Sequence, residues 1–254
     1  MIRIKSKDEI DKMRVAGFAV ARALTESRKV VVDGGSAFDV EKLILDIYRD
    51  LGVEPAFKGY MGYPYATCVS VNEEVIHGLP KRNKIFKKGD IVSIDTGAIY
   101  KGYYGDAALT YIVGETDEKS EKLVRVTREA LLKAVENLKP GLRIGDLGYI
   151  IQSYVEKHGF NVVRDYVGHG IGRELHEEPQ IPNYGRPGRG IVLKAGMTIA
   201  IEPMVSSGTW RVEVLDDGWT VVTADGSRSA HFEYTVVITE NGVEILTPWE
   251  WENG

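Results

Sequence analysis

The sequence predicts an α+β fold in which two related halves join their strands into one central antiparallel sheet, with four helices on one face of that sheet. An internal repeat supports this prediction. Adding 107 to a residue number carries segment 34–52 onto 141–159 and segment 86–95 onto 193–202 without a gap. A helical pattern and a strand pattern thus obey the same offset, which indicates a duplication with pseudo-two-fold symmetry.

Two helices are predicted in the first half. Ser6 and Glu9 form a capping box ahead of apolar residues that recur at helical spacing. Ser36 and Asp39 open a second helix, and Gly52 stands where a left-handed cap would end it. Two amphipathic helices therefore precede the first long strands.

The second half repeats this helix pair and adds a hairpin. Apolar spacing predicts one helix that begins near Thr116 and another that begins near Gly145 and ends at Gly159. Beyond residue 202 the offset of the repeat grows by 20 residues. Segment 210–223 accounts for the extra length, because it holds two strand-forming runs around an Asp-Asp-Gly turn.

Segment 91–113 holds two strand-forming runs, and each contains one aspartate. If residues 101–102 form a two-residue turn, Asp95 lies opposite Ala108, and Asp106 is its diagonal neighbour on the same face. Such neighbours have Cβ atoms about 7 Å apart, a separation that suits two metal ions about 3.5–4 Å apart. The alternative is a pair of turn or edge residues that face water. Mostly small and apolar neighbours disfavour it, because unpaired carboxylates there would cost several kcal/mol.

Composition restricts the class of protein. The 254 residues are 43% hydrophobic and can bury a sizeable core as one large domain or two intimate halves. A net charge of -5 disfavours a protein that grips nucleic acid, and no direct DNA binding is expected. No apolar run approaches membrane-spanning length. The single cysteine, Cys68, excludes an internal disulfide, and the amino terminus lacks the apolar core of a secretory signal, so the cytoplasm is the expected compartment.

The repeat brings two more acids to the site, because Glu202 aligns with Asp95 and Glu233 aligns with Asp106. The glycine-rich loop 168–172 adds His169. Oxygen-rich ligation with one nitrogen and no thiolate suits Mn, Fe, Co or Zn, and two divalent ions would nearly neutralise four carboxylates. A water that bridges two ions loses a proton readily and attacks a polarised carbonyl, while a free amine can ligate an ion. The sequence therefore predicts hydrolysis at an amino terminus.

Three further histidines allow more than one interpretation. His176 would suit a proton donor or an oxyanion contact over the metals, but it could equally cap a turn before Pro179. His77 stands at a strand end, where contact with a substrate backbone and simple packing are equally reasonable. His231 shares a strand face with Glu233 and is interpreted as a second-shell partner of the ligands.

Over essentially its whole length the sequence resembles the methionine aminopeptidases, specifically the short bacterial form of the type I group. The motifs that carry the resemblance are Ser93-Ile-Asp95-Thr-Gly, Gly105-Asp106, Gly168-His169-Gly-Ile-Gly-Arg-Glu-Leu-His176-Glu-Glu-Pro, Ile201-Glu202-Pro203, Phe232-Glu233, Val71-Asn72-Glu73 and His77-Gly-Leu-Pro80. Together these motifs are highly specific.

The resemblance implies the pita-bread fold as a single catalytic domain, residues 1–254, with pseudo-repeat halves of about 1–113 and 114–254. It implies that Glu202 shuttles the proton of the attacking water, that His176 assists at the carbonyl, and that His77 contacts the peptide beyond the cleaved bond. It also implies a site for two divalent ions, chosen from Co, Mn, Fe and Zn. The implied ligands are Asp95, Asp106, His169, Glu202 and Glu233.

A methionine pocket and a monovalent cation site are also implied by the resemblance. An apolar slot lined with aromatic rings and sulfur suits a thioether, although ordinary loop packing is the alternative for the two tyrosines. The pocket residues are Phe57, Tyr60, Tyr63, Cys68, Leu175 and Trp219, and the cation residues are Asn72, Glu74 and Ser229. The chain departs from its bacterial relatives at Leu175, His231 and Tyr234, which puts metal preference and pocket shape in question.

The implied function is removal of the initiator methionine from nascent chains whose second residue is small. One alternative is a proline-directed aminopeptidase or dipeptidase of the same fold, a class that usually carries a further amino-terminal domain. Another is a non-catalytic binding module, which the complete ligand set disfavours. We expect a monomer that acts on nascent amino termini. A basic cluster could touch the ribosome, although a solvated lysine-rich loop is the alternative; it comprises Lys81, Arg82, Lys84, Lys87 and Lys88.

Overall fold

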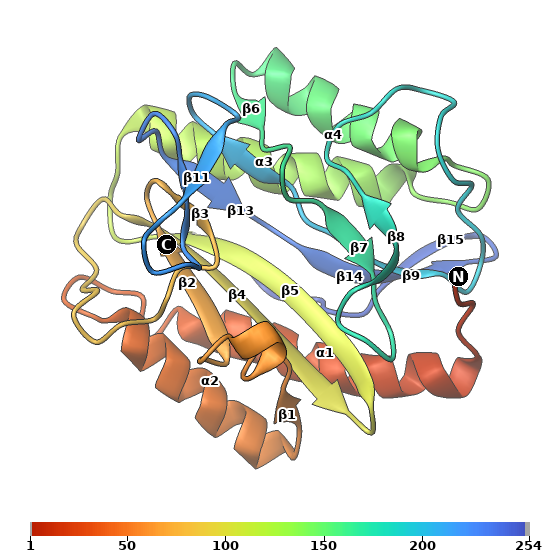
Figure 1. Cartoon of the computed structure of the whole chain (residues 1–254), viewed down its shortest axis with the longest axis horizontal. Coiled ribbons are helices and arrows are strands. Elements are labelled where there is room, and N and C mark those ends of the chain that lie inside the picture. Colours follow the sequence, from red (N-terminus) through yellow and green to blue (C-terminus); the bar gives the residue numbers. More distant parts are fainter. Residues whose placement is uncertain (1, 252–254) are drawn as a thin grey trace.

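Four long helices lie in two pairs in the computed structural model, which describes residues 2–251 (Figure 1). Helix α1 (Lys7–Ser27) packs on α2 (Ala37–Leu51), and α3 (Glu118–Asn137) packs on α4 (Ile144–Lys157). The capping box predicted at Ser6 and Glu9 is present, Ser36 and Asp39 form another, and Gly52 has the left-handed conformation of a helix cap. The predicted helix pairs are therefore confirmed.

The antiparallel strands pack against these helices, chiefly against α1 and α3, and a 3-10 turn, η1 (Tyr60–Gly62), precedes the second strand. The strands are β1 (Glu54–Pro55), β2 (Thr67–Val71), β3 (Glu74–Ile76), β4 (Ile91–Tyr100), β5 (Tyr103–Ile112), β6 (Asn161–Val162), β7 (Gly168–Gly170), β8 (Glu177–Ile181), β9 (Thr198–Ile201), β10 (Met204–Ser206), β11 (Val212–Val214), β12 (Val221–Thr223), β13 (Ser229–His231), β14 (Tyr234–Thr239) and β15 (Gly242–Ile245). Strands β11 and β12 form the predicted inserted hairpin. None of the helices in the described part of the chain has the length and apolar character needed to cross a bilayer.

The hairpin of β4 and β5 has the predicted register. Asp95 lies opposite Ala108, and Asp106 lies opposite Gly97, so the two aspartates are diagonal neighbours on one face. The turn residues Lys101 and Gly102 both have positive φ, at 49° and 77°, as a tight two-residue turn requires. No shift interrupts the pairing, which keeps both acids on the same side of the sheet.

Equivalent hydrogen bonds recur in the two halves at the offset of 107 residues. The Gly34 amide donates to the Phe86 carbonyl at 2.9 Å, and the Gly141 amide donates to the Leu193 carbonyl at 2.9 Å. Each bond ties the loop before a helix, α2 or α4, to the loop before a strand, β4 or β9. Equivalent hydrogen bonds therefore fix the start of the two strands that lead to Asp95 and Glu202.

Two threonines join the halves where β5 meets β13 and β14. The Thr235 hydroxyl accepts from the Asp106 amide at 3.1 Å and donates to the Asp106 carbonyl at 2.7 Å. The Thr110 hydroxyl accepts from the His231 amide at 3.0 Å and donates to the His231 carbonyl at 2.6 Å. These hydroxyl groups take the place of backbone hydrogen bonds between neighbouring strands. The strands of the two halves are therefore fixed in position relative to each other.

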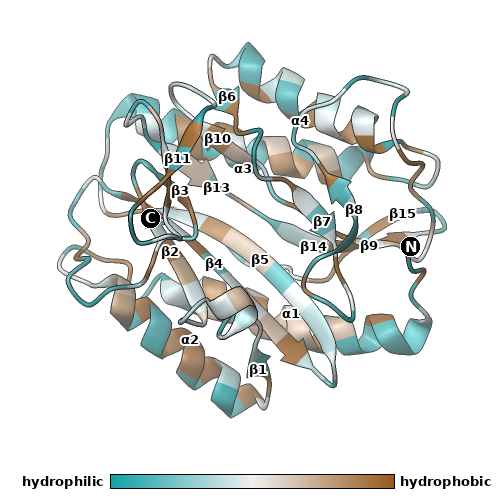
Figure 2. Ribbon diagram, viewed as in Figure 1, coloured by the Kyte–Doolittle hydropathy of each residue, from teal (hydrophilic) through white to brown (hydrophobic). Residues whose placement is uncertain are grey.

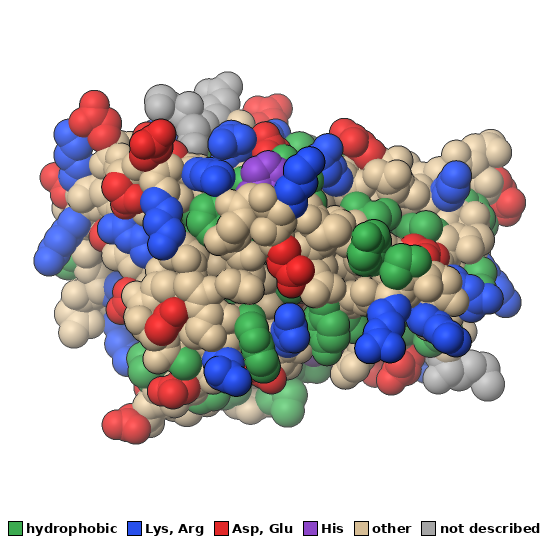
Figure 3. Space-filling view, turned by 90° about the horizontal axis from the view of Figure 1, so that it is seen from above, with side chains coloured by type: hydrophobic (Ala, Val, Ile, Leu, Met, Phe, Trp, Pro, Cys, Tyr) green, Lys and Arg blue, Asp and Glu red, His purple; other side chains and the backbone are tan. Residues whose placement is uncertain are grey.

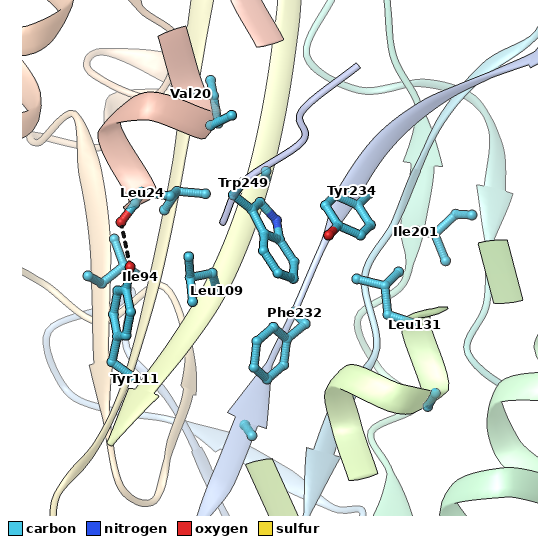
Figure 4. Packing of buried hydrophobic residues seen from close by; sticks show 14 of the residues in the cluster. Val20, Leu24, Ile94, Leu109, Tyr111, Leu131, Ile201, Phe232, Tyr234 and Trp249 are labelled. Carbon is cyan, nitrogen blue, oxygen red and sulfur yellow. Dashed lines mark hydrogen bonds between the residues drawn. The ribbon is translucent and has the colours of Figure 1, made fainter. Parts of the chain in front are cut away.

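The core behind this junction is closed by the carboxyl-terminal segment. The Trp249 ring stacks on Tyr234 with centroids 4.3 Å apart and also contacts Phe232, beside Leu131 of α3 (Figure 4). The Trp249 indole N–H donates to the Glu233 carbonyl at 2.8 Å. Apolar stripes of the helices face this core, while their outer faces are hydrophilic (Figure 2).

Strand alternation separates the helical face of the sheet from the face that carries the acids. Gly105 contacts the backbone of α1 at Gly17, and a Cβ atom at Gly105 would lie only 2.7 Å from the Gly17 nitrogen. The next residue, Asp106, points to the opposite face. Close packing of α1 therefore requires glycine beside the acid.

We predict that Gly105→Ala lowers the free energy of unfolding by about 1–3 kcal/mol, because the added methyl group overpacks the contact with α1. Urea unfolding of the metal-free protein measures this loss. The control is Val15→Ala on the exposed side of the same helix, which should change stability by no more than about 0.5 kcal/mol. Equal stability of the Gly105 variant and the parent protein would contradict the contact.

Candidate active site

The five predicted ligands converge on one cavity of about 150 Å³, although they come from distant parts of the chain. Asp95 lies on β4, Asp106 on β5 and His169 on β7; Glu202 follows β9, and Glu233 lies between β13 and β14. The His169 Nε2 atom is 3.7 Å from an Asp106 oxygen and 3.6 Å from a Glu202 oxygen. The structure thus brings together side chains that both halves contribute.

Glycines on either side of His169 allow β7 to lie between two other strands. A Cβ atom at Gly168 would clash with the carbonyl oxygen of Ala200 on β9, and one at Gly170 would clash with the carbonyl oxygen of Glu178 on β8. The His169 Nδ1 atom is 2.9 Å from the Gly170 carbonyl oxygen. This bond turns the Nε2 atom toward the acids, the arrangement typical of a metal-ligating histidine.

The carboxyl groups are placed where a negative charge is poorly stabilised. Asp106 and Glu233 are buried, and burial together with the neighbouring carboxylates raises the pKa of each well above its usual range. Burial raises the pKa values of Asp95 and Glu202 as well. The cavity has no lysine or arginine among its lining residues in the described part of the chain. Repulsion between the carboxylates is therefore not offset by a positively charged side chain in the cavity wall.

The donor atoms fit divalent metal ions. One buried oxygen each of Asp95, Asp106 and Glu233 has no hydrogen-bond partner within the described residues. Burial lowers the pKa of His169 to about 3, so its imidazole is neutral and offers a lone pair at neutral pH. Ligand atoms of Asp106, His169 and Glu233 lie within 4.8 Å of one another. Oxygen donors with a neutral imidazole suit Mn, Fe, Co or Zn.

All six residues predicted for the methionine pocket line the same cavity as the acids: Phe57, Tyr60, Tyr63, Cys68, Leu175 and Trp219. The rings of Tyr63 and Trp219 meet edge to face with centroids 5.0 Å apart. The Tyr63 hydroxyl donates to the Thr67 carbonyl at 2.9 Å, which anchors its ring at the start of β2. An apolar slot thus adjoins the candidate metal ligands directly.

Met61 also lines this cavity, and the sequence analysis did not select it. It lies in η1 between the two pocket tyrosines and is 83% exposed. A thioether at the pocket mouth can contact an apolar substrate side chain. Its position between Tyr60 and Tyr63 was the signal that could have identified it.

His77 and His176 lie at the junction of this cavity with a larger cleft of about 590 Å³. The His176 Nδ1 atom is 2.8 Å from the Tyr60 hydroxyl oxygen, and the ring centroids of His176 and His169 are 4.3 Å apart. His77 has a φ of 57°, a strained conformation for a residue other than glycine. Both imidazoles therefore adjoin the space in which a scissile bond would lie.

The residues predicted for a monovalent cation lie together where β3 approaches β13. The Ser229 amide donates to the Asn72 carbonyl at 2.8 Å. Their side chains are already engaged, because Asn72 donates to Asp90 and Glu74 pairs with Lys84 at 2.7 Å. A cation at this place would have to use main-chain carbonyl oxygens.

Three comparisons with known proteins show which proteins this chain is similar to. The model of metallopeptidase family M24 matches residues 11–240. A methionine aminopeptidase of Clostridium acetobutylicum is 51% identical over 247 residues, 97% of this chain and 99% of the relative. The crystal structure of a methionine aminopeptidase from Thermotoga maritima superposes with a TM-score of 0.97 at 68% identity, covering 97% of this chain and 99% of that one. A prolidase from Pyrococcus furiosus superposes with a TM-score of 0.80 at 29% identity, but this chain spans only 66% of its length.

We predict that Asp106→Asn raises the unfolding temperature of chelator-treated protein at pH 7–8, because it removes one of several repelling charges. The same change should lower the affinity for Mn²⁺ and Co²⁺ by at least about tenfold, since a ligand is lost. Scanning calorimetry and titration calorimetry measure the two effects. The control Asp216→Asn, at an exposed turn, should alter neither. A metal-free variant less stable than the parent would contradict charge repulsion.

Proposed function

The chain belongs to metallopeptidase family M24, and from that premise we propose how its residues perform the reaction. It is an aminopeptidase that removes an N-terminal methionine in a metal-dependent reaction, as its similarity to methionine aminopeptidases over almost the full length shows. Its fold is the pita-bread fold of those enzymes and of prolidases. One observation supports the proposed residue roles most strongly, namely that the candidate ligands and the apolar pocket line one cavity.

In the proposed site two divalent ions are held by Asp95, Asp106, His169, Glu202 and Glu233. When bound, such ions polarise the scissile carbonyl and lower the pKa of water. The unpartnered buried oxygens and the neutral imidazole support this assignment. Co, Mn, Fe and Zn all suit the donor set, so the identity of the ions is proposed only as one of these four.

The proton is proposed to move through Glu202. Its carboxyl group is half-buried at the cavity wall, and burial raises its pKa above the ordinary value. A carboxyl group so tuned can accept a proton from water and return it to the leaving amine near neutral pH. Its place in the common wall of both cavities brings it close to the bond to be cleaved.

His176 is proposed to donate a hydrogen bond to the carbonyl oxygen at which negative charge develops. If the Tyr60 hydroxyl donates to Nδ1 across the observed 2.8 Å, the imidazole proton resides on Nε2. The Nε2 atom is then a donor at the site of reaction. We propose that His77, at the mouth of the larger cleft, contacts the main chain of the peptide beyond the cleaved bond.

The methionine side chain is proposed to occupy the apolar slot, with the rest of the polypeptide in the larger cleft. The next residue then lies at the junction of the two cavities, beside His77 and His176, which line both of them. We therefore propose a requirement for a small second residue. Nascent chains in the cytoplasm are the proposed substrates, and a reduced Cys68 beside the slot fits that compartment.

Four finer properties are also proposed. A duplication underlies the halves of one catalytic domain, which is supported by their equivalent hydrogen bonds. A monovalent cation binds main-chain oxygens near Asn72, Glu74 and Ser229.

A monomer is proposed because charges of both signs are interspersed over the face in Figure 3. Ribosome contact is proposed for the basic cluster, although Lys84 and Lys88 are paired with Glu74 and Glu115. Co-sedimentation with ribosomes that persists after Lys81→Glu and Lys87→Glu would reject this contact.

We predict that the protein loaded with Co²⁺ or Mn²⁺ hydrolyses Met-Ala-Ser and leaves Ala-Pro-Ala intact. The apolar slot accepts the thioether side chain, whereas alanine fills little of it. Both reactions are measured by chromatography of the free amino acid that is released. Met-Trp-Ser is the control for the second position and should be cleaved much more slowly than Met-Ala-Ser. Preferred cleavage of Ala-Pro-Ala would assign the chain to the prolidase activity instead.

We predict that Tyr60→Phe lowers kcat about tenfold, the loss expected when about 1.4 kcal/mol of transition-state stabilisation disappears. The phenyl ring remains in the slot, so KM for Met-Ala-Ser should change little. The control Tyr149→Phe, on the exposed side of α4, should leave both constants unchanged. A rise in KM with constant kcat would show that the hydroxyl acts in binding and not through His176.

A further inference from the structure

His231 is a buried imidazole close to the proposed metal ligands. It ends β13, two residues before Glu233, and only 1% of it is exposed. Neither ring nitrogen has a hydrogen-bond partner within the described residues. A buried polar group without a partner costs about 1–3 kcal/mol. Ligation of a cation by one of these nitrogens would offset that cost.

One ring nitrogen of His231 lies close to a carboxylate oxygen of Glu202, at the separation expected of two ligands of one ion. His231 Nε2 is 3.4 Å from Glu202 Oε2. Two donors that each lie about 2.1 Å from one ion are about 3.0–3.4 Å apart in octahedral to tetrahedral geometry. Ligand atoms of Glu202, His231 and Glu233 lie within 4.8 Å of one another, as do those of Asp106, His169 and Glu233. Glu233 is common to both groups.

The alternative is that His231 only orients a ligand by donating a hydrogen bond to Glu202. The separation of 3.4 Å does not meet hydrogen-bond geometry, since Nε2 has no partner. An outer-sphere histidine also satisfies its nitrogens with carboxylate or carbonyl groups. His169 does this at Nδ1 with the Gly170 carbonyl, whereas His231 does it at neither nitrogen. The observed geometry therefore favours direct ligation.

We propose that His231 is a ligand of the dinuclear centre, so that one ion is bound by His169 and the other by His231, with Glu233 shared between them. This inference rests on the proposed metal centre and differs from the sequence-based interpretation, in which His231 only supports the ligands from outside the metal. A second neutral imidazole adds a nitrogen donor to an otherwise carboxylate-bound ion. Nitrogen ligation favours Fe, Co and Zn over Mn and Mg at that position.

The test is the proton NMR spectrum of protein loaded with two equivalents of Co²⁺. An imidazole that ligates Co²⁺ directly gives an exchangeable N–H resonance far outside the diamagnetic range. Wild-type protein is expected to show two such resonances, from His169 and His231. His231→Leu, which keeps a similar volume, is expected to retain one, and the control His158→Leu at the end of α4 is expected to retain both.

One resonance in the fully loaded wild-type protein would overturn the ligation by His231 while leaving the metal centre intact. No shifted resonance, together with no Co²⁺ binding by calorimetry, would overturn the metal centre itself. The wild-type spectrum decides between these results even if His231→Leu folds poorly. Folding of that variant is checked in metal-free protein, where loss of an unpartnered imidazole should leave the unfolding temperature unchanged or higher.

A binding titration supplies a second measurement that does not depend on catalysis. In wild-type protein the two Co²⁺ equivalents should bind in separate steps. In His231→Leu one step should weaken more than about 100-fold, beyond the 10–100-fold typical of a lost outer-sphere partner. The other step should persist, because His169, Asp106 and Glu233 remain. Two unchanged steps would contradict the inference.

Discussion

Repulsion among four carboxyl groups in one cavity is the constraint on which this structure depends. Asp106 and Glu233 are buried, and Asp95 and Glu202 face the same space. In a site that excludes water such charges raise one another's pKa values and oppose folding. Cations that bind between the carboxylates remove this repulsion and stabilise the folded chain. The cavity therefore destabilises the metal-free chain and, for the same reason, is suited to bind metal ions.

Holding these groups together requires a rigid scaffold on the opposite face of the sheet. Gly105 permits close contact with α1, and Thr235 bonds to the backbone of Asp106 from the other half. Trp249 packs behind Glu233 and donates to its carbonyl. The outer layers of the protein thus fix the backbone of the acids, while the side chains remain free to bind cations.

In the proposed function, substrate recognition uses segments outside this repeated scaffold. The turn η1 supplies Tyr60 and Met61, and the inserted hairpin supplies Trp219 next to its turn. Neither segment has an equivalent in the other half, so the slot lies on one side of the pseudo-symmetric centre. In that proposal the repeated part of the fold binds the metal ions, whereas the added segments select the side chain to be released.

The sequence alone determined the helices, the acid-bearing hairpin and its register, because capping boxes, a two-residue turn and strand alternation are local rules. The repeat also aligned Glu202 with Asp95, and the motifs identified the residues of the slot. The tertiary structure showed that the predicted carboxyl groups share one cavity, and it alone decided that Met61 lies at the mouth of that cavity and that the buried nitrogens of His231 have no hydrogen-bond partner among residues 2–251. Those facts depend on contacts between distant segments, and local patterns do not encode the distances between such segments.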